Sequence, residues 1–80
     1  MGYKIKIFNT EIEALNLIGE LETQINDVWG EPLYSSTLNK WGVILDGYFE
    51  MDIITVIGQT EWDNSTILEN TNPDWFEIKK

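Results

Sequence analysis

Residues 41–58 have the sequence WGVILDGYFEMDIITVIG, and the fold class depends most on the interpretation of these eighteen residues. Residues 41–45 are apolar, and the Asp46-Gly47 dipeptide that follows suits the positive φ angles of a type I′ hairpin turn. Residues 53–57 are β-branched and apolar on both faces, which is typical of a central strand covered by a helix. We therefore expect a β-hairpin here, with its second strand beginning at Tyr48.

The N-terminal residues predict a strand followed by a helix. Residues 3–8 (YKIKIF) alternate between apolar side chains and lysines, which is the period of a half-buried strand. Residues 10–13 (TEIE) fit a capping box, in which a threonine and a glutamate satisfy each other's backbone N–H groups. Apolar residues then recur at spacings of three and four along one stripe: Ala14, Leu17, Ile18, Leu21, Ile25, Val28 and Trp29. We expect one helix over about 10–29.

The other segments carry weaker signals. Residues 30–40 lack a clean period and predict an ordered surface loop or an irregular strand. Residues 59–66 have a turn-like composition, and residues 73–78 suit either a short last strand or aromatic packing against a sheet edge. We expect an α+β fold in a single compact domain, 1–80, with one amphipathic helix on a small, mostly antiparallel sheet of three to four strands. The expected order is β-α-β-β, with the short last strand as an addition.

The composition excludes several classes of site. The 80 residues contain 14 acids and five lysines, with a net charge of −9 and no arginine, histidine or cysteine. Without cysteine there is no disulfide framework or thiolate zinc site, and without histidine there is no Ser-His or Cys-His nucleophile. Apolar runs are far too short to span a bilayer and no leader pattern is present, so we expect a cytoplasmic protein without direct contact to membrane or nucleic acid.

The acids are separated from the bases along the chain. Residues 7–39 carry six acids and no base, and residues 41–78 carry eight acids and no base. Acidity for solubility is one explanation. The separation of acids from bases favours a second explanation, in which the acids form a broad negative field that attracts basic proteins. Because proteins that bind nucleic acid have basic surfaces, an acidic domain can occupy their site by imitating phosphate charge.

Carboxylates could also serve chemistry. Asp46, Glu50, Asp52, Glu61 and Asp63 are hard oxygen ligands of the kind that calcium or magnesium takes, but their spacing does not match an EF-hand loop. The pair Asp46 and Glu50 could act as acid and base in glycoside hydrolysis. In so short a chain, solvated turn carboxylates are the simpler interpretation. We expect no enzyme activity, metal or cofactor.

The four tryptophans divide into two pairs. Trp29 and Trp41 fall on the helix stripe and on a strand, and are expected in the core. Trp62 and Trp75, set among acids, either cover the end of the core or form a binding hot spot for a basic partner. The predicted partner-binding residues are Glu13, Glu20, Asp27, Asp46, Glu50, Asp52, Glu61, Trp62, Asp63 and Trp75.

Four short segments, 8-FNTEIEAL-15, 29-WGEP-32, 41-WGVILDG-47 and 74-DWF-76, resemble small uncharacterised proteins encoded by phages and prophages. The resemblance implies a phage accessory role in the host cytoplasm and carries no catalytic residues. Two function classes follow. One is an inhibitor that binds a basic host or defence protein by nucleic-acid mimicry. The other is a structural or assembly subunit held by aromatic and sheet-edge contacts, including self-association into a homo-oligomer.

Overall fold

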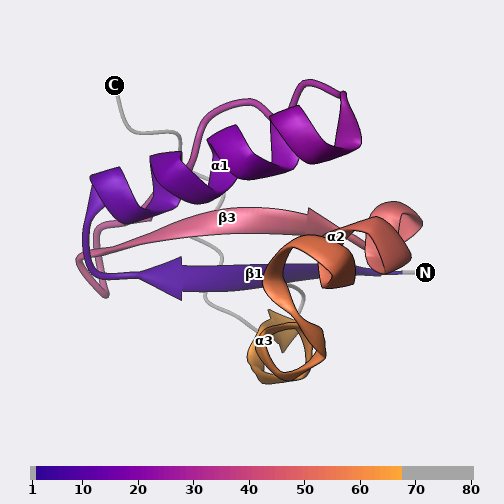
Figure 1. Cartoon of the computed structure of the whole chain (residues 1–80). Helices are drawn as coiled ribbons and strands as arrows, with labels where there is room; N and C mark the ends of the chain where they lie inside the picture. Colours follow the sequence, from indigo (N-terminus) through magenta and orange to yellow (C-terminus); the bar gives the residue numbers. More distant parts are fainter. Residues whose placement is uncertain (1, 68–80) are drawn as a thin grey trace.

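The computed structural model describes residues 2–67 and shows an α+β fold, in which helices pack on a four-stranded antiparallel sheet (Figure 1). The elements are β1 (Tyr3–Phe8), α1 (Glu11–Ile25), β2 (Leu33–Ser35), β3 (Lys40–Asp46), the 3-10 helix η1 (Gly47–Phe49), α2 (Glu50–Ile57), α3 (Gln59–Asn64) and β4 (Thr66–Ile67). The strand order is β2-β3-β1-β4, so β1 and β3 are central. The α+β class and antiparallel sheet are as predicted, and the expected last strand at 73–78 lies outside the described residues.

The central strands β1 and β3 pair antiparallel along their whole length, from Tyr3 opposite Asp46 to Phe8 opposite Trp41. Side chains alternate across a strand, so this register fixes the residues that share a face. Val43 and Leu45 point toward the helices and are fully buried in the main core. Their partners on β1 are lysines, so the helices pack on the lysine-bearing face of β1.

The main hydrophobic core lies between the sheet and the helices. Figure 1 shows α1 running alongside β3 while α2 crosses in front of the strands. The buried side chains come from both layers and from α3: Ala14, Leu17, Ile18, Leu21, Val43, Leu45, Ile53 and Trp62. Trp29 and Trp41 are partly buried against this cluster, as expected from their places in the sequence.

Helix α1 begins as the capping box predicts. The Thr10 hydroxyl accepts a hydrogen bond from the Glu13 N–H at 3.3 Å, and the Thr10 N–H donates to the Glu13 carboxylate at 3.2 Å. Two N–H groups that the first helical turn leaves without a backbone partner are thereby satisfied.

The end of α1 differs from the prediction, because the helix stops at Ile25 and not near residue 29. Asn26 takes a left-handed conformation with φ of 62° and its N–H donates to the Glu22 carbonyl at 2.9 Å, which closes the helix. Val28 is consequently 85% exposed and does not belong to the apolar stripe. Trp29 still reaches the core from the following loop, where its indole N–H donates to the Ile44 carbonyl at 2.6 Å.

The predicted hairpin at Asp46-Gly47 is wrong, because the chain enters a helix after β3. The Asp46 side chain accepts a hydrogen bond from the Tyr48 N–H at 2.9 Å and so caps η1, which leads directly into α2. Residues 53–57, predicted as a central strand, form the second half of α2. Packing against α1 and the sheet thus overrides the β propensity of this apolar run.

The turn-like segment 59–66 is also corrected, since most of it forms α3. Gly58, with φ of 96°, separates α2 from α3 and donates its N–H to the Ile54 carbonyl at 2.7 Å. Such a positive φ suits glycine, which has no Cβ to clash. Residues 33–35 within the predicted loop or irregular strand pair with β3 as the edge strand β2.

Replacing Gly47 with alanine is expected to lower the free energy of unfolding by about 1–3 kcal/mol, the usual range for overpacking. A Cβ at this position would lie 2.4 Å from the Gly2 carbonyl oxygen, which itself accepts the Gly47 N–H at 2.9 Å. Chemical denaturation measures the loss. The matched control is Gly19→Ala, where nothing lies within 4 Å of the added Cβ, and which is expected to stabilise α1 by up to about 1 kcal/mol. Equal effects at the two glycines would contradict the close approach at Gly47.

Candidate protein-binding surface

An open groove of about 420 Å³ runs between α1 on one side and α2 and α3 on the other. Its apolar lining comes from three elements: Phe8 of β1, Leu17 of α1, and Val56 and Ile57 of α2. We call this feature, together with the charged residues that border it, the acidic groove. It exists because α2 is a helix, which turns Val56 and Ile57 toward α1.

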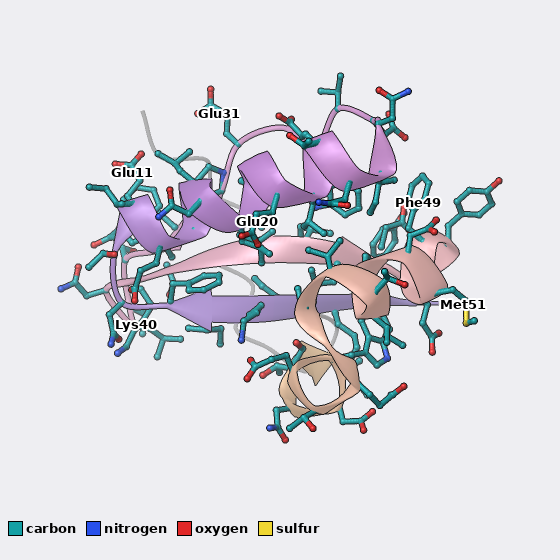
Figure 2. All side chains as sticks on the ribbon, in the orientation of Figure 1. Glu11, Glu20, Glu31, Lys40, Phe49 and Met51 are labelled. Atoms are coloured by element: carbon teal, nitrogen blue, oxygen red, sulfur yellow. The ribbon has the colours of Figure 1, made fainter. Side chains whose placement is uncertain are left out.

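Three predicted binding residues border the acidic groove, although they are far apart in the sequence. Glu13 and Glu20 come from α1, and Glu61 comes from α3. Figure 2 shows Glu20 on the side of α1 that faces the strands. Lys6 is the cation in the lining and forms an ion pair with Glu61. The lining therefore carries three carboxylates and one lysine.

The described lysines neutralise few carboxylates. Lys4 donates to the Trp62 carbonyl at 2.6 Å and lies over the Trp62 ring, and Lys40 donates to the Asn9 side chain. Residues 2–67 contain eleven carboxylates, and the ion pair found within these residues is that of Lys6 with Glu61. Because the same residues contain only three lysines, Lys4, Lys6 and Lys40, the charge of this part of the chain stays strongly negative.

The remaining predicted acids do not border the acidic groove. Asp46 caps η1, while Glu50 and Asp52 occupy the first turn of α2, where carboxylates complement the helix dipole. Asp27 lies in the loop after α1 and accepts a hydrogen bond from the Val28 N–H at 2.8 Å. Asp63 is exposed on α3 and accepts from the Gln59 side chain at 2.9 Å. The predicted acids thus occupy more than one region of the surface.

Of the two tryptophans predicted to bind a partner, Trp62 and Trp75, the structure describes only Trp62. Trp62 is only 7% exposed and belongs to the main core, so the interpretation as an exposed hot spot is corrected in favour of a core role. The reason is that α3 turns the ring inward against the sheet, and Lys4 lies 4.9 Å from its centroid. Trp75 lies outside the described residues.

The sequence reading missed an exposed apolar surface around η1. Val28, Tyr48 and Met51 are 85%, 72% and 80% exposed, and Tyr48 packs edge-on against Phe49 with ring centroids 4.9 Å apart. Figure 2 shows Phe49 and Met51 at the end of the molecule opposite Glu11 and Lys40. We call Val28, Tyr48, Phe49 and Met51 the η1 patch. The signal that could have revealed it is the break in the apolar stripe after Asn26, together with the helical spacing of residues 49–57.

Within residues 2–67, no three or more acidic, histidine or cysteine side chains come together in a way that could hold a metal ion. In the same residues, no helix combines the length and apolar character that a membrane span needs.

Comparison with known proteins gives no relative. No model of a protein family matches the chain, and no significant match exists among curated proteins or solved structures. The function of this chain is therefore inferred from the geometry and charge of its surface.

Proposed function

We propose that this protein is a non-enzymatic acidic module that binds a basic segment of another protein in the acidic groove. The observation that carries the proposal is the combination of an apolar floor with a rim of three carboxylates and one lysine. Lysine and arginine side chains have the complementary chemistry, because their aliphatic stems can lie on apolar residues while the charged head stays at the rim.

The charge of the rim favours a cationic partner over an anionic one. Glu61 forms an ion pair with Lys6, whereas Glu20 has no ion-pair partner within residues 2–67. Uncompensated charges of one sign speed the encounter with a partner of the opposite sign and disfavour partners of the same sign. Surfaces rich in lysine and arginine are typical of nucleic-acid-binding proteins. We infer that the partner is such a protein, and that the module acts as an accessory inhibitor, of the phage type, through charge mimicry.

The charge reversal Glu20→Lys is expected to weaken binding of an oligolysine peptide by about tenfold at low salt, equivalent to about 1.4 kcal/mol. The substitution replaces attraction at the rim with repulsion and leaves the core untouched, because Glu20 is exposed. Fluorescence anisotropy at low and high salt measures both the affinity and its screening.

The matched control is Glu31→Lys, which makes the same change in net charge on the opposite side of α1 (Figure 2). Equal weakening by the two variants would show that the peptide responds to net charge and not to the acidic groove. A pull-down from host lysate completes the test, with recovery of a basic nucleic-acid-binding protein expected at low salt and its loss at high salt.

The η1 patch favours a second candidate, a structural or assembly subunit. Exposed tyrosine and methionine are enriched at protein interfaces, and they are grouped here at one end of the molecule. Aromatic contact through this patch or pairing along the edge strand β2 would give association with little salt dependence. A homo-oligomer detected by light scattering, without salt-sensitive capture of a basic protein, would favour this candidate.

A further inference from the structure

Helix α1 presents two carboxylates to the acidic groove at a regular spacing. Glu13 and Glu20 both line the groove and lie seven positions apart in α1. Seven residues of an α-helix fall about 20° short of two full turns and rise about 10.5 Å, so the two residues share one face. Leu17 lies between them on that face and belongs to the apolar floor. The rim along α1 therefore places an apolar residue between two acids.

The two acids on α1 are accessible, and one of them is held in a fixed position. Both Glu13 and Glu20 are exposed. At its Oε1 atom, the Glu13 carboxylate accepts the Thr10 N–H at 3.2 Å and the Thr10 hydroxyl at 3.1 Å. A carboxylate accepts further bonds at its second oxygen. Because Glu61, across the groove, already forms an ion pair with Lys6, we expect the acids of α1 to set the position of a basic partner.

The spacing of these two acids distinguishes between two backbone conformations of a bound segment. In an extended strand, side chains on one face recur every second residue, at about 6.7 Å and then at about 13.4 Å. Neither value matches the separation of the two acids along α1. In a helix that runs alongside α1, residues i and i+7 share one face at the same separation of about 10.5 Å. A helical partner therefore brings one basic side chain to each acid at the same time.

We propose that the acidic groove binds an amphipathic α-helix of the partner, with two basic residues seven positions apart. This inference rests on the proposed function and specifies the partner of the same site. Residues i+3 and i+4 of such a helix lie between the two basic residues on the same face. They are expected to be apolar, because they meet the floor formed by Leu17, Val56 and Ile57. The partner helix thus lies along α1 and inserts this one stripe of side chains.

Three synthetic peptides test the conformation of the partner. The first has lysines at positions i and i+7 and leucines at i+3 and i+4, in a background of alanine and glutamine. The second has the same composition with the second lysine at i+5, which lies about 140° around the helix from the first. The third keeps the first pattern and carries one central proline, which breaks the helix. By fluorescence anisotropy at low salt, we expect the first peptide to bind about tenfold more tightly than either of the others.

A matched pair of protein variants tests the position of the peptide. Glu20→Gln removes one charge from the rim and is expected to weaken binding of the first peptide by about fivefold. Replacing one of the two peptide lysines with glutamine, whichever faces Glu20, is expected to abolish most of this difference. The control is Glu31→Gln, on the opposite side of α1 (Figure 2), which is expected to leave the affinity unchanged. Circular dichroism verifies that both variants are folded and that the first two peptides have equal helix content.

The results that would overturn the helical partner differ from those that would overturn the proposed function. Failure of the first peptide to bind, or equal affinity for the first peptide and either of the others, would overturn the helical partner. Equal affinity of the first peptide for Glu20→Gln and for the unchanged protein would do the same. The proposed function survives these results if Glu20→Lys still weakens oligolysine binding more than Glu31→Lys does. Equal weakening by those two charge reversals would overturn the proposed function and the helical partner together.

Discussion

Replacing Ile53 with alanine is expected to lower the free energy of unfolding by about 2–5 kcal/mol. Ile53 is fully buried in the main core, where α2 packs against both α1 and the sheet. Removing its branched side chain loses apolar burial and leaves a cavity that the surrounding layers fill only in part. A domain of this size has a total stability of roughly 4–12 kcal/mol, so the loss is a large share. Urea denaturation followed by circular dichroism measures it.

The control is Thr55→Ala, two residues further along α2. Thr55 is exposed and its hydroxyl donates to the Met51 carbonyl at 3.0 Å, so the change is expected to alter the stability by no more than about 0.5 kcal/mol. In a strand, residues 53 and 55 would share a face, whereas in a helix they lie about 200° apart. Comparable losses at both positions would contradict the helix.

The parts of the fold that the sequence predicts are those in which local chemistry is sufficient. The capping box at Thr10 and Glu13 fixes the start of α1 through hydrogen bonds only three residues apart. Strand β1 is recognisable from its alternation of apolar residues and lysines, and β3 from its short apolar run. These signals depend on no other part of the chain, and the α+β class follows from them.

The helical structure of residues 48–57 could not be predicted without information from the rest of the chain. Their β-branched composition favours a strand, while the positions of Phe49, Ile53 and Ile57 have the spacing of a helix. Asp46 favours the helix locally, because its carboxylate accepts a hydrogen bond from the Tyr48 N–H. In the sequence, however, an Asp-Gly pair is compatible both with this cap and with a hairpin turn. The sequence also does not show that α1 leaves part of the sheet uncovered, where α2 packs beside α1.

The sequence predicts the negative charge of the candidate site, but it does not predict which residues come together to form the acidic groove. Counting acids and lysines identifies a negative surface without any coordinates. The acidic groove depends on α2 and α3, both of which the sequence reading missed, because they bring Val56, Ile57 and Glu61 to the side of α1 that carries Glu20. The burial of Trp62 has the same origin, since a turn at 59–66 would have left the ring in solvent.

Replacing Trp62 with alanine is expected to lower the free energy of unfolding by about 3–5 kcal/mol, since a large ring is lost from the main core. The change also removes the ring face over which the Lys4 amine lies, a cation–π contact of roughly 0.5–1 kcal/mol at an accessible site. Chemical denaturation gives the loss, and the Trp62→Phe variant, which keeps an aromatic ring, is expected to lose less.

The binding measurement separates the core role of Trp62 from a hot-spot role. In the Trp62→Phe variant, which keeps the core filled by an aromatic ring, affinity for oligolysine is expected to match that of the unchanged protein. A buried ring offers a partner little contact area, so its replacement acts on folding and leaves the rim of the acidic groove in place. If Trp62→Ala instead weakened binding strongly while the free energy of unfolding stayed the same, the ring would be a partner contact, and the inward orientation of α3 would be wrong.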